Sequence, residues 1–270
     1  MAKACVEMAY WDLSARVEGI SLSKKLGGTR DRVPVGVSIG LQPSDEVLHE
    51  KVAGYVEEGY ARIKLKIKPG RDVSMLGGLR AAFPDVPFMA DANSAYTLAD
   101  APRLAELDAF KLMMIEQPLS YNDFLDHARL QELLETPVCL DESIKSEGDL
   151  ELALELGSGR IVNIKPGRVG GLSASIRIHD TMRARDLAVW CGGMLESGVG
   201  RAHNVALASL PGFTLPGDIS ASRRYWEQDI VTPEFEVADG HMAVPTGPGI
   251  GVELDMDRIE SLTTRRVEFS

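Results

Sequence analysis

Short apolar runs alternate with amphipathic stretches along most of the chain. Eight runs rich in apolar and β-branched residues predict strands at residues 35–39, 62–67, 87–90, 112–115, 138–140, 161–164, 188–191 and 213–215. Apolar residues three and four positions apart predict helices at 45–58, 124–134 and 173–185. Thr97 and Ser146 each precede an acidic residue by three positions, which predicts helix starts after the third and fifth strands. The alternation is typical of parallel strands joined by helices.

Different patterns flank this region on both sides. Apolar residues at helical spacing begin the chain, namely Val6, Tyr10, Leu13 and Val17. This helix is expected to end near Gly19 and to lead into a polar connector. Residues 225–244 predict a strand pair outside the repeated region. We therefore divide the chain into a helix and connector (1–33), an α/β barrel (34–222), and C-terminal strands with a tail (223–270).

The polar residue that closes each central strand recurs at a nearly constant interval. These residues are Lys66, Asp91, Glu116, Asp141 and Lys165, separated by 25, 25, 25 and 24 positions. One strand, one helix and two turns occupy about that length, and eight such units close into a barrel. The carboxyl ends of barrel strands converge on one mouth, where barrel enzymes keep their chemistry. The spacing therefore predicts five ionisable groups around a single pocket.

The three acids of this set come from successive strands and so line one side of the mouth. Carboxylates held that close repel one another unless a cation lies between them. Oxygen-only ligands favour a hard ion, so we predict Mg²⁺, with Mn²⁺ as the alternative. Asn93 and Glu142 lie beside these acids and either support the site or cap their loops.

Two lysines in one strand point to proton transfer. Lys64 and Lys66 share a strand face because side chains alternate, and we expect that face to be the barrel interior. Lys165, four strands later, should face them across the pocket. Close packing among cations lowers a lysine's pKa toward neutrality, so that one amine accepts a proton. A metal beside a substrate carboxylate would stabilise the enediolate that forms when the α-proton leaves.

Composition narrows the class of partner. The net charge of −11 would repel a phosphate backbone, and no apolar run is long enough to span a bilayer, so neither nucleic acid nor membrane is expected. Three scattered cysteines, Cys5, Cys139 and Cys191, fit reduced thiols in the cytoplasm better than disulfides. A small-molecule carboxylate remains the expected partner.

Six motifs in order resemble the muconate-lactonizing subgroup of the enolase superfamily. They are Lys64-Leu-Lys66, Asp91-Ala-Asn93, Ile115-Glu-Gln-Pro118, Leu140-Asp-Glu-Ser143, Asn163-Ile-Lys-Pro-Gly-Arg168 and Gly192-Gly-Met-Leu-Glu-Ser197. Within the subgroup they are most similar to the branch of o-succinylbenzoate synthases and N-acylamino acid racemases. The resemblance implies a (β/α)7β TIM barrel with a small C-terminal extension.

The resemblance also implies roles for individual residues. Asp91, Glu116 and Asp141 would bind Mg²⁺, while Lys66 and Lys165 would be the base and the acid or base on opposite faces of the substrate. Lys64 would assist Lys66, and Arg168 matches a position of the racemase-like branch. The implied substrate contacts are Ser38, Asn93, Gly193, Met194 and Leu195. The implied reactions are dehydration to o-succinylbenzoate, for menaquinone synthesis, and racemization of N-acylamino acids.

Three alternatives stay open at this point. Lys165 could form a Schiff base in a barrel lyase, and Asp218 stands alone where dipeptide epimerases carry paired aspartates. A catalytically silent barrel is the third. The family has an N-terminal α+β domain that covers the mouth, and this chain begins at the junction with the barrel. We therefore expect a chemically complete but poorly covered site, and apolar surface that favours a homo-oligomer.

Overall fold

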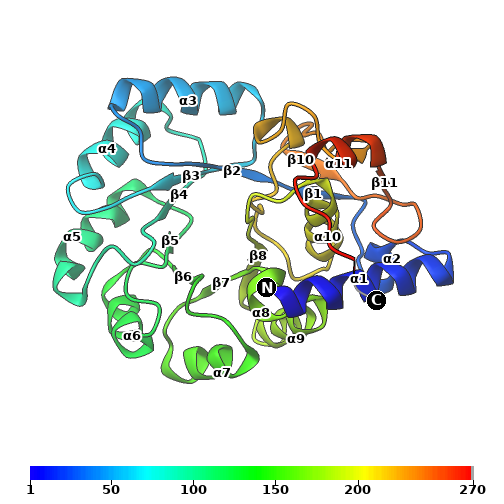
Figure 1. The fold of residues 1–270 in the computed structure, drawn as a ribbon. Coiled ribbons are helices and arrows are strands. Elements are labelled where there is room, and N and C mark those ends of the chain that lie inside the picture. Colours follow the sequence, from blue (N-terminus) through cyan, green and yellow to red (C-terminus); the bar gives the residue numbers. More distant parts are fainter. Residues whose placement is uncertain (269–270) are drawn as a thin grey trace.

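The computed structural model describes residues 1–268, and a curled sheet of parallel strands forms its centre (Figure 1). The strands are β2 (Gly36–Ile39), β3 (Arg62–Lys66), β4 (Phe88–Asp91), β5 (Ile115–Glu116), β6 (Val138–Leu140), β7 (Ile161–Ile164) and β8 (Ala188–Cys191). Each strand pairs in parallel with the next in sequence. This order confirms the predicted α/β fold and seven of its eight strands.

The gap between β8 and β2 is filled by an irregular segment, residues 213–218, which we call the seam. The predicted strand at 213–215 is wrong, because only isolated bridges join Phe213 to Val189 and Gly217 to Val35. Three backbone hydrogen bonds nevertheless close the ring: Gly36 donates to Gly217, Gly217 to Pro34, and Asp218 to Cys191. Pro211 precedes this short segment and Pro216 lies within it; neither supplies a backbone N–H, which limits regular pairing.

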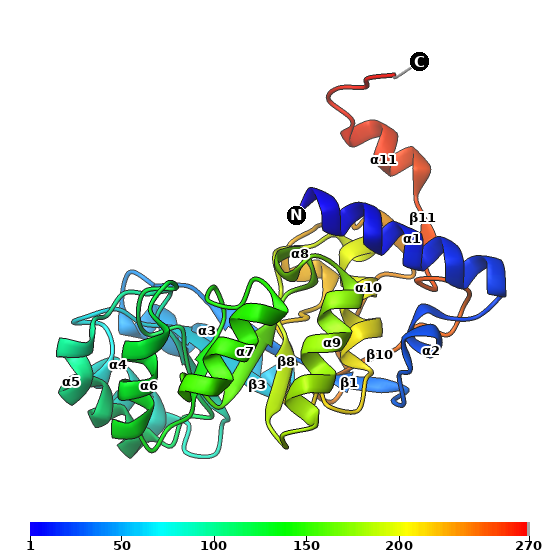
Figure 2. The same ribbon diagram turned by 90° about the horizontal axis from the view of Figure 1, so that it is seen from below.

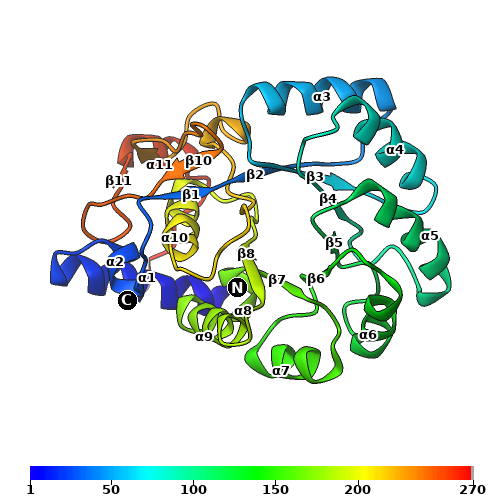
Figure 3. The ribbon, with the colours of Figure 1, turned by 180° about the vertical axis from the view of Figure 1, so that it is seen from behind.

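Helices cover the outside of the sheet (Figure 3). They are α3 (Asp45–Glu57), α4 (Val73–Ala82), α5 (Ala101–Ala105), α6 (Phe124–Leu133), α7 (Glu147–Leu156), α8 (Pro166–Val169), α9 (Leu172–Arg183) and α10 (Gly198–Ala208), with 3₁₀ turns η1 (Leu98–Asp100) and η2 (Glu106–Phe110). The predicted start at Ser146 is confirmed, since its side chain accepts from the backbone N–H of Asp149. Thr97 begins η1, which leads into the short helix α5.

Two apolar clusters hold these layers together. The larger one lies between strands and helices and contains most of the buried aliphatic residues. The smaller one consists of Met89, Met114, Cys139, Ile161 and Trp190, with partly buried residues around it. All five of its members come from strands or strand edges on the interior side of the ring. The interior is therefore a packed floor beneath the polar mouth.

The N-terminal helix α1 (Ala2–Glu18) ends at Gly19, which takes a left-handed conformation, as predicted. Its apolar stripe is exposed, however: Val6, Tyr10, Leu13 and Val17 are 75%, 69%, 59% and 81% accessible. The small residues Ala4 and Ala15 are buried instead. Glu7 accepts from the backbone N–H groups of Leu172 and Ser173, so α1 caps the start of α9.

The connector contains a helix that the sequence pattern did not predict, α2 (Leu22–Leu26), and a strand, β1 (Arg32–Pro34). The C-terminal elements are η3 (Ser222–Arg224), β9 (Val231–Thr232), β10 (His241–Ala243), β11 (Glu253–Leu254) and α11 (Met256–Leu262). The predicted strand pair within 225–244 is wrong, because β10 pairs with β1 and β9 pairs with β11. In both Figure 1 and Figure 2, α1 and α11 lie on the side of the molecule away from α4 and α5, and Figure 1 shows the two helices apart from each other.

None of the helices in residues 1–268 combines the length and the apolar character that crossing a bilayer requires.

Candidate active site

The five residues singled out by their spacing meet at one end of the ring. Lys66, Asp91 and Glu116 are the last residues of β3, β4 and β5 and lie in register, so each is the lateral neighbour of the next. Asp141 and Lys165 directly follow β6 and β7. A cavity of about 290 Å³ opens there, and Lys64, Lys66, Asp91 and Lys165 line it. The predicted convergence of these side chains is thus present in the structure.

Every lysine of the mouth contacts a carboxylate. Lys66 Nζ lies 2.5 Å from Asp91 Oδ2, and Lys165 Nζ lies 2.7 Å from Asp141 Oδ2. Lys64 Nζ lies 2.9 Å from Glu116 Oε2 and 3.2 Å from Asp91 Oδ2. Lys64 and the three acids are almost fully buried, so these contacts form away from bulk water.

Burial and crowding set the charge state of the central acid. Burial raises the pKa of Glu116 to about 8; Lys64 opposes this, and the charges of Asp91 and Asp141 add to it. Burial also opposes ionisation of Asp91, but Lys64 and Lys66 outweigh it and hold the pKa of Asp91 below its usual value. The charge of Lys64 therefore does not outweigh burial and acid–acid repulsion at Glu116, the middle acid of the trio.

Lys64 is not the lysine whose pKa is lowered by neighbouring cations. Burial works against its charge, but neighbouring carboxylates, Asp218 first, raise the pKa of Lys64 well above its usual value. The reason is that Lys64 lies among acids, with Arg62 as the cation that acts against them. Lys64 is therefore a charged group in this arrangement and not a free amine.

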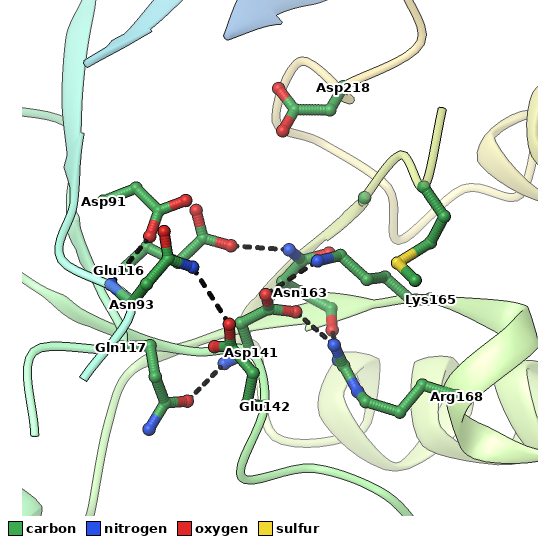
Figure 4. Close-up of polar contacts among 12 residues, drawn as sticks. Asp91, Asn93, Glu116, Gln117, Asp141, Glu142, Asn163, Lys165, Arg168 and Asp218 are labelled. Atoms are coloured by element: carbon green, nitrogen blue, oxygen red, sulfur yellow. Dashed lines mark hydrogen bonds and ion pairs between the residues drawn. The ribbon is translucent and has the colours of Figure 1, made fainter. Parts of the chain in front are cut away.

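Neighbouring polar groups fix the acids in place (Figure 4). Asn163 Nδ2 donates to Glu116 Oε1 at 2.6 Å, and Arg168 donates to Asp141 and to two backbone carbonyl groups. Gln117 Oε1 accepts from the backbone N–H of Asp141 at 3.0 Å and of Ser143 at 3.1 Å. Gln117 thereby ties the loop after β5 to the loop after β6.

The predicted substrate contacts divide into two groups. Ser38, Gly193 and Leu195 line the cavity, as expected of residues that touch a ligand. Asn93 instead accepts from Lys66 and donates to Glu142 Oε1 at 3.0 Å, and Met194 is exposed outside the cavity lining. The structure thus places Asn93 and Glu142 as a pair that supports Lys66.

Sequence reasoning did not place a fourth acid, Asp218, at the mouth. Asp218, at the end of the seam, lies 2.5 Å from Lys64 Nζ and 2.7 Å from Arg62 Nη1. Burial opposes its ionisation, but Lys64 and Arg62 hold the pKa of Asp218 well below its usual value. Arg62 starts β3 two residues before Lys64 on the same face, and strand alternation could have revealed it. Figure 4 shows Asp218 standing apart from the other acids.

The donor chemistry fits a divalent cation, although the arrangement is not yet that of a ligand set. Within the described part of the chain, no three His, Cys, Asp or Glu side chains are gathered as metal ligands. Asp91, Glu116 and Asp141 nevertheless offer only carboxylate oxygens, which hard cations prefer. Lys64 and Lys66 now neutralise two of these acids. An ion between the acids would have to take over those contacts.

The family model described as "Enolase C-terminal domain-like" matches residues 47–258. The chain belongs to this family. A crystal structure of an enolase superfamily member from Listeria innocua has a TM-score of 0.94 and 51% identity, and covers 97% of this chain and 70% of that chain. Enolase superfamily members generally use a divalent metal ion, and that use agrees with the donor chemistry at the mouth.

Two curated relatives narrow the position within the enolase superfamily. The o-succinylbenzoate synthase of Geobacillus kaustophilus is 59% identical over 97% of this chain and 70% of its own length. The N-succinylamino acid racemase of Thermus thermophilus is 53% identical over 97% of this chain and 71% of its own length. The chain is thus an enzyme of the enolase superfamily, in the branch that contains these two activities.

Proposed function

We propose that the chain catalyses removal of a proton α to a substrate carboxylate, as an o-succinylbenzoate synthase, an N-acylamino acid racemase, or both. One observation carries this proposal: Lys66 and Lys165 line the same cavity from strands four places apart in the ring. Two amines on opposite sides of one bound carbon are what removal and return of a proton require. The two relatives' activities support the same chemistry.

The cation that we propose is Mg²⁺, and Asp91, Glu116 and Asp141 would hold it. When bound, it supplies positive charge beside the substrate carboxylate, which makes the adjacent carbon more acidic. The raised pKa of Glu116 supports this assignment, because a cation would offset the mutual repulsion of the acids. Mn²⁺ is the alternative ion.

The lysines carry the proton steps. In the synthase reaction Lys66 Nζ would take the α-proton of a cyclohexadiene carboxylate and give that proton to the departing hydroxyl group, which leaves as water. In racemization one lysine takes the α-proton and the other returns a proton to the opposite face. Lys64 stays charged, as its raised pKa indicates, and faces the substrate carboxylate. Asn93 orients Lys66 through a hydrogen bond.

The decisive experiment follows exchange of the α-proton in D₂O by ¹H NMR, with each enantiomer of N-succinylphenylalanine and with Mg²⁺. We expect exchange in the intact chain and its loss on chelation by EDTA. Lys66→Ala should abolish exchange of one enantiomer and Lys165→Ala that of the other, because each variant keeps the lysine on one face. Lys68→Ala, on the exposed loop just past Lys66, is the matched control and should exchange normally.

Other outcomes would favour the alternatives. Trapping of Lys165 by borohydride in the presence of substrate would indicate a Schiff-base lyase. Exchange of dipeptides in preference to N-acylamino acids would indicate an epimerase. Absence of exchange with every substrate, and no binding of Mg²⁺ by titration calorimetry, would indicate a silent barrel. Exchange that persists in EDTA would contradict the metal-dependent reaction.

A further inference from the structure

One cation of the cavity wall has no acid beside it. Lys64, Lys66 and Lys165 each contact a carboxylate of the mouth. Arg224 lines the same cavity, yet within residues 1–268 it makes no ion pair with an acid. A partly buried guanidinium without a negative partner is costly, and such a group favours an anionic ligand.

Neighbouring residues fix the position of the Arg224 guanidinium but leave some of its hydrogen-bond donors without a partner. Its two terminal nitrogens donate to Tyr55 Oη and to the backbone carbonyl of Ser38, at the end of β2. Its guanidinium lies 5.1 Å from the ring centre of Tyr55 and 5.4 Å from that of Tyr225. Its Nε is buried without a hydrogen-bond partner. Each terminal nitrogen has two N–H groups, so donors remain after these contacts.

The location of Arg224 separates it from the acids that would hold a metal. Arg224 is tied to Ser38 on β2, whereas the acids lie at the ends of β4, β5 and β6. Lys64, Lys66 and Lys165 lie in the same cavity. A ligand that fills the cavity would therefore meet the lysines at the end where the acids lie and Arg224 at the other end.

We propose that Arg224, the last residue of η3, is the residue that binds the distal carboxylate of a succinyl-type acyl group. This inference rests on the proposed function, which places the α-carboxylate at the metal end of the cavity. A succinyl group carries such a distal carboxylate, and both named relatives act on succinyl compounds by their names. Planar guanidinium groups recognise carboxylates through two parallel hydrogen bonds.

The test compares N-succinylphenylalanine with the same compound whose distal carboxylate is converted to a primary amide. The two probes match in size and differ in charge. Binding is measured by titration calorimetry with Mg²⁺ present, and α-proton exchange is measured separately. We expect the intact chain to prefer the charged probe by about tenfold or more, the range of one hydrogen bond to a charged group. Arg224→Gln should erase that preference, and Arg224→Lys should keep part of it.

Arg223→Gln is the matched control, because Arg223 neighbours Arg224 in η3 but is exposed and pairs with Glu58. It should retain the preference in full. Three results would overturn the proposal: no preference in the intact chain, no binding of either probe, or equal weakening of both probes by Arg224→Gln. The last result would mean that Arg224 only fixes the loop. Preferential binding without α-proton exchange would uphold Arg224 and refute the proposed function, so the two failures can be told apart.

Discussion

Regular strands form the part of the mouth that carries Asp91, Glu116 and Asp141, while the opposite part, at the seam, is formed by loop. On the first side, register places each functional residue beside the next, and backbone pairing is continuous from β3 to β8. On the seam side, Asp218 of the seam and Arg224 of η3 reach the cavity from segments outside the seven strands.

The two sides also differ in how charge is arranged. The strand side gathers acids that repel one another and that Lys64, Lys66 and Lys165 neutralise. On the seam side, Asp218 pairs with two cations, Arg62 and Lys64, and Arg224 of η3 makes no ion pair within the described residues. The strand side is thus suited to hold a cation and the seam side to hold an anion, which fits a substrate bound between them.

The largest expected effect lies on the strand side, in Asp91→Asn. The amide keeps the size of the side chain but removes one of the charges that would hold Mg²⁺. We expect the affinity for Mg²⁺ to fall by more than the tenfold to hundredfold typical of residues that only support a ligand. Titration calorimetry measures the change, and Glu58→Gln, at an exposed position, is the control. An unchanged affinity would remove Asp91 from the ligand set.

The next effect lies at the seam, in Asp218→Asn. The substitution leaves Arg62, which is 1% accessible, without its carboxylate partner. Breaking a buried ion pair costs about 3–5 kcal/mol. Urea unfolding measures the loss, and Asp126→Asn, in an exposed pair with Arg129, should change stability by less than about 1 kcal/mol. If both variants lost the same small free energy of unfolding, the ion pair between Asp218 and Arg62 would not stabilise the seam.

Gly192→Ala tests whether the space beside Gly192, which follows β8 next to the seam, is needed by Asn163 and Lys165. A Cβ atom there would lie 2.2 Å from Asn163 Oδ1 and 2.7 Å from Lys165 Cε, so both side chains would have to move. Overpacking of this kind lowers the free energy of unfolding by about 1–3 kcal/mol. We expect α-proton exchange to slow as well, because Lys165 would be displaced. Gly167→Ala, with no atom within 4 Å of the added carbon, is the control. A normal exchange rate in Gly192→Ala would show that Lys165 needs no such space.

The smallest effect concerns Asp72, which links the loops after β3 and β4. Tyr96 Oη donates to Asp72 Oδ2 at 2.9 Å, so Tyr96→Phe should lower the free energy of unfolding by about 1 kcal/mol near neutral pH. Burial opposes ionisation of Asp72, but Arg103 and other hydrogen-bond donors hold the pKa of Asp72 below its usual value.

The sign of the pH dependence follows from that lowered pKa. Stability from Asp72 is fully present above the pKa of an unfolded aspartate, about 3.9, and is lost as the pH falls through the lower, folded value. The difference between Tyr96→Phe and the intact chain should therefore shrink in acid. Unfolding curves from neutral pH to pH 3 measure it. A difference that grows in acid would contradict the assigned role of Asp72.

The strand side was predictable from the sequence because its residues occupy fixed positions in a repeating unit. A spacing of 25 residues and strand alternation together place Lys64, Lys66 and Asp91 at one end of the ring. The seam could not be predicted from the sequence, because residues 213–218 lack regular pairing. Asp218 reaches Lys64 only through tertiary folding. Arg224 lies in a 3₁₀ turn, where no periodic pattern shows the direction of a side chain.

The ends of the chain show a further limit of prediction from the hydrophobic pattern. The spacing of Val6 and Tyr10 correctly predicted a helix, but not which face of it is covered, because Ala4, Ala15 and Glu7 make the contacts with the barrel. In the C-terminal part, apolar runs predicted strands near β9 and β10, whose partners β11 and β1 lie elsewhere in the sequence. The local sequence pattern therefore predicted these elements, whereas tertiary packing determines which strands pair and which helix face is buried.

The folded structure shields two of the three thiols from reagents in solution. Cys139 and Cys191 are buried, and burial raises the pKa of both thiols, whereas Cys5 is exposed on α1. Thiolates are the reactive form towards alkylating reagents. A brief pulse of such a reagent would mark one sulfur in a folded molecule and three in an unfolded one, and mass spectrometry would count the two populations in a mixture.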